Sequence, residues 1–280
     1  LWFSFLTQDF LQSYKYAKKW VGLFQENKKL IALHPVFYLK GKNYLLEASF
    51  FVKKISTFKE ELQSFEEDIA QDYIPLNTNT EVLLFQYIYA NKLHLHFLEA
   101  TFSEGEYLVA IINKKIEQYQ SRLDSHHIVM LYYKIACLYF GSGNNEKAIE
   151  YLNKIINWKV DLRTDLQCYA RLLHLIAHYE LGNFDLLEYL IKSVYRFMGK
   201  MENLSSVEEE MFKFLRHAFK LTPGKLKPAF IKLLESIRKY EGNRFETRAF
   251  VYLDVISWLE SKIEEIPVQN VIHNKYKRQK

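Results

Sequence analysis

The sequence predicts an all-helical protein built from a stack of antiparallel helical hairpins, and three observations support this fold class. Glycine and proline number only 9 and 5 among 280 residues, so few turns interrupt the backbone. Apolar residues recur at the three- and four-residue spacing of an amphipathic helix on both sides of short polar breaks. Three of these breaks contain a glycine, at Gly105, Gly143 and Gly182, at intervals of 38 and 39 residues.

The first hundred residues contain four helical patterns. Pro35 opens the second pattern, because proline is favoured in the first turn of a helix. Thr80 follows the most loop-like stretch, IPLNTNT, and is expected to cap the fourth helix. In chain order we expect helices over residues 4–25, 35–53, 57–72 and 81–102.

The centre of the chain gives the clearest hairpin, in residues 132–156. One helical face precedes the break at Gly143 and another follows it, which requires two antiparallel helices joined by a short loop. A single hairpin cannot bury both faces, so neighbouring hairpins are expected to stack on it. The two faces consist of Tyr132, Ile135, Ala136 and Tyr139, and of Ala148, Leu152, Ile155 and Ile156.

This central segment resembles the tetratricopeptide repeat. The resemblance lies in the aromatic, small and glycine positions of the repeat, and Val160 stands where that family usually has proline. The copies around Gly105 and Gly182 match less well. The resemblance implies a right-handed α-solenoid of stacked hairpins. The matching residues are Tyr132, Ile135, Ala136, Tyr139, Gly143 and Ala148.

The C-terminal part continues the helical pattern without the motif. Ser206 is expected to cap a helix with three glutamates near its start, and further helices are expected over 225–240 and 249–263. The resulting domains, which could also form one continuous solenoid, are N-terminal helices with one divergent hairpin (1–73), tetratricopeptide-like repeats (80–200), capping helices (206–265) and a basic, disordered tail (266–280).

No catalytic, cofactor-binding or metal site is expected. Cys137 and Cys168 lie inside apolar helical patterns, with no adjacent base to activate them. His174 and His178 have the i, i+4 spacing of a metal-binding pair, but no acidic third ligand stands nearby, so polar positions at a helix seam are favoured. His126-His127 fits a helix cap. The sequence therefore predicts a protein that is not an enzyme.

The resemblance implies a scaffold that binds a protein or peptide through a concave groove lined by the first helix of each hairpin. For the best-matching repeat, this assigns the groove to Met130, Tyr133, Cys137 and Phe140. The alternative is that these side chains pack against the next hairpin, and the sequence leaves both open.

A second function is a nucleic-acid-associated or regulatory module that uses the basic C-terminal region. The net charge is +5, with four basic residues in KYKRQK at the end of the chain. No apolar run approaches the ~18 residues that span a bilayer, so no membrane partner is expected, and two cysteines without a disulfide framework favour the cytoplasm. The basic candidates are Lys213, Arg216, His217, Lys220, Lys225 and Lys227.

Overall fold

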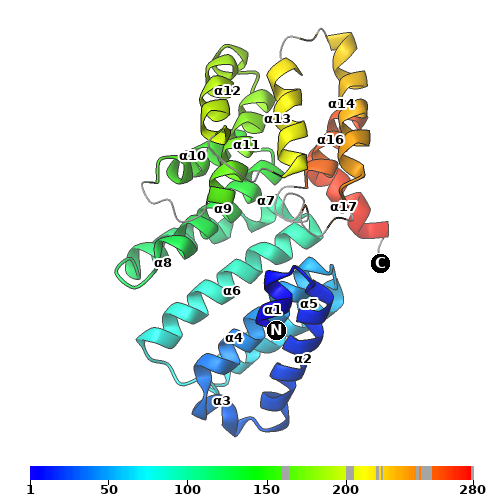
Figure 1. Cartoon of the computed structure of the whole chain (residues 1–280). Coiled ribbons are helices and arrows are strands. Elements are labelled where there is room, and N and C mark those ends of the chain that lie inside the picture. Colours follow the sequence, from blue (N-terminus) through cyan, green and yellow to red (C-terminus); the bar gives the residue numbers. More distant parts are fainter. Residues whose placement is uncertain are drawn as a thin grey trace. The chain divides into compact units, whose positions relative to one another are not determined.

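The structure is a computed structural model that describes residues 1–158, 164–199, 205–218, 221, 223–241, 243, 246 and 254–278. Every regular element in these ranges is an α-helix (Figure 1), which confirms the all-α class. Lys220 and the start of the expected helix 249–263 lie outside the described residues.

The chain divides into two compact units. The first comprises Leu1–Leu98 and Tyr107–Leu123, and the second comprises Glu99–Glu106 and Asp124–Lys280. This division differs from the expected domains, since the boundary expected between 73 and 80 falls inside the first unit. The reason is that side chains of the helix after this boundary bond back to the preceding helices, as in the 3.0 Å hydrogen bond between Asn91 and Asn43.

The first unit begins with two helices where one was expected over 4–25. Gln8 adopts a left-handed φ of 56°, and the Asp9 carboxylate caps the second helix by accepting from the Gln12 N–H at 3.1 Å. The helices of this unit are α1 (Trp2–Leu6), α2 (Phe10–Glu26), α3 (Lys29–Leu33), α4 (Pro35–Phe51), α5 (Ile55–Ala70), α6 (Thr78–Glu99) and α8 (Tyr107–Gln118). Helix α4 starts at Pro35, as expected.

Helix α4 packs against α2 and α5 and meets α6 through Asn43 and Phe50, and polar side chains fix its contacts. Lys42 is fully buried and pairs with Glu61 of α5 at 2.7 Å. Tyr38 donates a hydrogen bond from its hydroxyl to Asp68 of α5. Because Lys42 and Tyr38 each have a specific partner on α5, these bonds select one alignment of the helices over a shifted one.

Two sequence expectations fail around α6. Its first turn is capped by Asn77, whose Oδ1 accepts from the N–H groups of Asn79 and Thr80, so Thr80 is not the cap. Ala100, directly after α6, has a φ of 56°, and Gly105 shows no positive φ because it ends the short helix α7 (Phe102–Gly105). The turn in that region therefore depends on Ala100.

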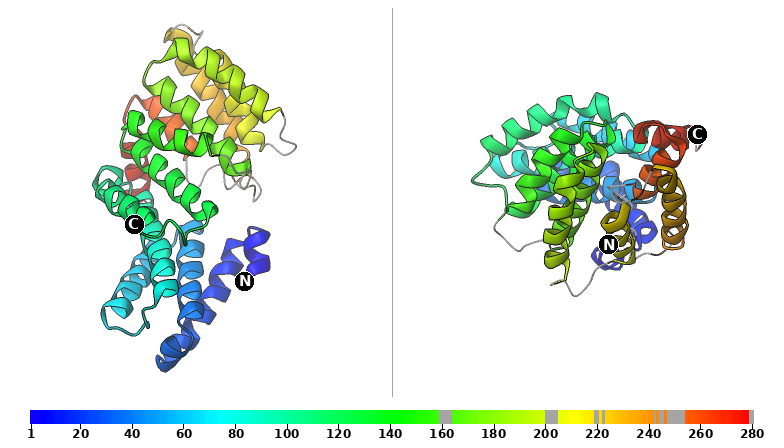
Figure 2. Two further views of the ribbon diagram at one scale, coloured as in Figure 1. Left: turned by 90° about the vertical axis from the view of Figure 1, so that its left-hand side faces the viewer. Right: turned by 90° about the horizontal axis from the view of Figure 1, so that it is seen from above.

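The second unit contains stacked hairpins, as the sequence predicts. In the α9–α10 and α11–α12 hairpins the turn is made by a glycine with positive φ, 85° at Gly143 and 71° at Gly182. Helices α9, α11 and α13 contact one another in series, and Figure 2 shows the hairpins side by side in chain order. The helices of these hairpins are α9 (Ser125–Gly141), α10 (Asn145–Ile156), α11 (Thr164–Glu180), α12 (Phe184–Met198), α13 (Ser206–Ala218) and α14 (Pro223–Arg238).

The second unit ends with helices α16 (Val255–Glu264) and α17 (Val268–Arg278). Trp258 is buried and donates its indole N–H to Glu180 of α11 at 2.7 Å. The expectation of a disordered tail over 266–280 is wrong for residues 268–278. Val271 and Tyr276 bury one face of α17, and this packing outweighs the positive charge at its end.

Candidate functional site

The groove residues expected on α9 lie mostly in the core. Tyr133, Cys137 and Phe140 are only 2%, 3% and 5% exposed, and Met130 is half-buried. Burial also raises the pKa of the Cys137 thiol to about 12, so this side chain stays protonated and apolar in character. The alternative of packing against neighbouring helices agrees with the burial of Tyr133, Cys137 and Phe140.

Phe140 also borders a cavity of about 340 Å³ at the ends of α9 and α11, which residues of α16 and α17 line as well. Its charged groups already satisfy each other. Glu180 accepts from Trp258 and from Lys262, whose Nζ lies 2.6 Å from the carboxylate. This cavity therefore belongs to the seam that holds the C-terminal helices.

His174 and His178 lie together on α11, with ring centroids 4.5 Å apart. Burial, and then the neighbouring His178, lowers the pKa of His174 to about 4, so the ring is neutral near pH 7. His178 Nδ1 lies 3.1 Å from the Asn183 amide. Among the described residues no group of three or more His, Cys, Asp or Glu side chains is arranged to hold a metal ion. The pair is a polar part of a helix seam.

The second buried cysteine, Cys168, shares this chemistry. Its pKa is raised to about 12, first by burial and then by the negative charge of Glu208. A thiol of this kind is a poor nucleophile at neutral pH.

The basic residues expected to act together are separated by the structure. Lys213 pairs with Glu210 at 3.2 Å and with Glu209 at 3.6 Å, and Lys227 pairs with Glu265 at 3.4 Å. Lys225 is exposed on α14. Among the described members of this set, Arg216 and His217 line the same site, at the end of α13.

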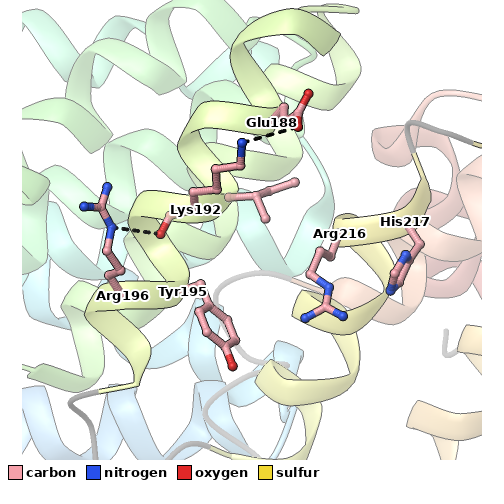
Figure 3. Close-up of a pocket in the computed structure, with 7 residues that line it drawn as sticks. Glu188, Lys192, Tyr195, Arg196, Arg216 and His217 are labelled. Carbon is pink, nitrogen blue, oxygen red and sulfur yellow. Dashed lines mark hydrogen bonds and ion pairs between the residues drawn. The ribbon is translucent and has the colours of Figure 1, made fainter.

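That site is a cleft of about 550 Å³ between α12 and α13, here called the α12–α13 cleft. Figure 3 shows Tyr195 on α12 and Arg216 on α13 facing the space between the two helices from opposite walls. The α12 residues recur at the spacing of one helical face, so a single helix supplies a continuous wall. The lining residues are Glu188, Ile191, Lys192, Tyr195, Arg196, Arg216 and His217.

The apolar part of the α12–α13 cleft comes from Ile191 and Tyr195. Ile191 is buried at the base, whereas Tyr195 is 58% exposed. The Tyr195 ring stacks on Phe212 of α13, with centroids 5.9 Å apart and an interplanar angle of 23°. This stack fixes the position of Tyr195 and joins the two walls.

The charged part is predominantly positive. Lys192 and Glu188 form an exposed i, i+4 ion pair at 3.4 Å, and the Arg196 Nε donates to the Lys192 carbonyl at 3.3 Å. Within the described part of the chain, no carboxylate lies at ion-pair distance from Arg196 or Arg216. The cleft therefore offers guanidinium groups beside an apolar surface.

Sequence reasoning missed this cleft because it joins residues on two different helices, and periodicity within one helix does not show which faces of two helices meet. A usable signal was present on α12. Glu188, Lys192 and Arg196 follow one another at i, i+4 and i+8, and Ile191 and Tyr195 run beside them with the same step. Aromatic residues and arginine are enriched at protein interfaces, so Tyr195 beside Arg196 on one helix face indicates a surface that contacts a partner.

Comparison with known proteins identifies the central hairpin. The family model of the tetratricopeptide repeat matches residues 131–159, which covers most of α9 and all of α10. The match confirms the resemblance for this hairpin, and the flanking repeats around Gly105 and Gly182 are not confirmed by it. No curated protein and no solved structure gives a significant match. The repeat supports a helical-repeat protein with a general role in protein–protein interaction.

Across the described helices, none combines the length and the apolar character needed to cross a membrane.

Proposed function

We propose that the chain is a non-enzymatic helical-repeat scaffold that binds a segment of another protein in the α12–α13 cleft. The observation that carries this proposal is the cleft itself, a concave site with an aromatic and two arginines in a unit of stacked hairpins. Its volume lies in the range of about 300–1,000 Å³ that is usual for ligand sites.

The walls of the α12–α13 cleft are held in place by the core. On α12, Leu187 and Val194 are buried, and on α13, Met211 and Leu215 are buried, so each helix is anchored by the face turned away from solvent. Rigid walls lose little conformational freedom when a partner binds. A partner segment can thus insert one or two side chains without unfolding the hairpins.

Site-specific photo-crosslinking in extract of the source cells tests the proposal. The full chain carries p-benzoylphenylalanine in place of Tyr195, and a matched chain carries it in place of Tyr189. Tyr189 lies on the same helix and is 65% exposed, but it does not line the cleft. We expect a discrete protein adduct from position 195 that is absent from position 189 and is lost when Arg216→Glu is added.

Adducts that are identical from both positions, or that survive Arg216→Glu, would contradict the proposal. So would the absence of any adduct from position 195.

A further inference from the structure

The α12–α13 cleft presents positive charge beside an apolar wall, and this combination restricts what can bind there. Resting on the function proposed above, we infer that the bound segment presents an aspartate or glutamate next to a bulky apolar side chain. One carboxylate meets Arg216, a second can meet Lys192, and the apolar side chain lies against Ile191 and Tyr195.

A carboxylate on the bound segment is inferred from the ion-pairing state of Arg216 and of Lys192. Arg216 has no carboxylate partner among the described residues, and its planar guanidinium can hold a carboxylate through two parallel hydrogen bonds. Lys192 has Glu188 as a partner, but both side chains are more than half exposed, 69% and 56%. An exposed pair of this kind contributes little, so Lys192 can exchange Glu188 for an incoming carboxylate.

The bulky apolar side chain is inferred from Ile191 and Tyr195, the apolar residues of the α12 wall. Ile191 forms the base, and the Tyr195 ring is more than half exposed although its position is fixed on Phe212. A fixed, exposed aromatic gains from being covered by an apolar group without losing further rotational freedom. A side chain such as Phe or Leu covers both residues.

The same groups argue against a nucleic-acid strand as the occupant. A backbone of phosphates needs a series of cations, whereas here Glu188 stands among the basic residues of the α12 wall. Lys213 and Lys227, which could extend the series, do not line the cleft. One or two carboxylates on a peptide suit the site better.

Selection from a phage library of random 12-residue peptides on the immobilised full chain tests the inference. We expect enrichment of peptides with an acidic residue beside a large apolar one. The synthetic peptide GSDFELSG is then compared by fluorescence anisotropy with GSNFQLSG, which lacks the charges, and with GSDAEASG, which lacks the apolar side chains. Each control is expected to bind at least about tenfold more weakly.

Variants locate the binding. Arg216→Gln should weaken GSDFELSG about tenfold, because the bidentate contact is lost. Lys213→Gln, on the same helix but outside the cleft, should leave the affinity within about twofold. Glu188→Gln should strengthen binding about two- to threefold, because it frees Lys192.

Equal binding of GSNFQLSG, or equal affinity of wild type and Arg216→Gln, would overturn the inference. The proposed function would still stand if the crosslink from position 195 persisted. If selection enriched no peptide and the crosslink was also absent, both would fail. An oligonucleotide that bound the cleft more tightly than GSDFELSG would overturn the inference in favour of nucleic acid.

Discussion

The α9–α10 and α11–α12 hairpins share a design but differ in what they show to solvent. Both turn at a glycine with positive φ, and in both the first helix is buried along most of its length. The outer face of α10 is polar, with Glu146, Glu150 and Lys154 exposed. The outer face of α12 instead exposes Leu186 and the tyrosines described above. The hairpin that matches the family model exposes mainly polar side chains on its second helix. The α11–α12 hairpin exposes tyrosines and a leucine there instead.

One position accounts for part of this difference. Ala148 of α10 is fully buried and lets α9 and α10 approach closely, whereas Leu187 of α12 is the buried residue after the corresponding turn. A leucine keeps two helices further apart than an alanine. Accordingly α9 and α10 contact each other along more of their length than α11 and α12 do.

The largest expected effect on stability distinguishes a buried tyrosine of α9 from an exposed tyrosine of α12. Tyr133→Ala removes a buried ring from α9 and should lower the free energy of unfolding by roughly 3–5 kcal/mol. Tyr195→Ala removes an exposed ring and should lower it by less than about 1 kcal/mol. Urea unfolding followed by circular dichroism measures both. Similar losses for the two variants would show that Tyr195 also belongs to the framework.

A smaller effect concerns acid stability in the α11–α12 hairpin. The pKa of His174 is lowered to about 4 from 6.5, so between these values the unfolded chain binds a proton that the folded chain does not. Stability should fall as pH falls from 6.5 to 4, by about 3 kcal/mol from this group. His174→Gln should remove that part of the slope. An unchanged slope in urea unfolding across this pH range would contradict the prediction.

The smallest expected effect on stability concerns the glycine turn that both hairpins share. Gly143→Ala places a side chain at φ of 85° and should destabilise the protein by about 1 kcal/mol, although space is available for the added carbon. The control Gly22→Ala lies inside α2, also in open space, and should stabilise by roughly 0.5–1 kcal/mol. Thermal unfolding gives the sign of each change. A stabilising Gly143→Ala would show that the turn does not depend on the left-handed conformation.

Local patterns in the sequence predicted those features of the fold that depend on local chemistry. Pro35 marked the start of α4, and the apolar faces around Gly143 and Gly182 marked two hairpins. The pattern was misleading at Gly105, because Ala100 adopts the left-handed conformation that glycine adopts more easily. Tertiary contacts there decide against local preference.

The candidate site was less accessible to sequence reasoning. Arg216 and His217 were expected to bind a partner, but as part of a basic set that the structure divides between ion pairs and the cleft. The resemblance to a repeat directed attention to Tyr133 and Cys137, which are buried. Spacing along one helix shows which residues share a face, but it does not show whether a neighbouring hairpin covers that face.

Neither unit is a continuous stretch of chain, because residues 99–106 belong to the second unit and residues 107–123 return to the first. Residues 99–106 are held in the second unit by side-chain contacts. The Phe102 ring lies against Gly141, and Ser103 bonds to Gln269 at 3.2 Å. A protease cut after Leu98 would strip α8 from the first unit, and one after Leu123 would strip this segment from the second. No single cut releases either half intact, so truncation would damage the part it was meant to isolate.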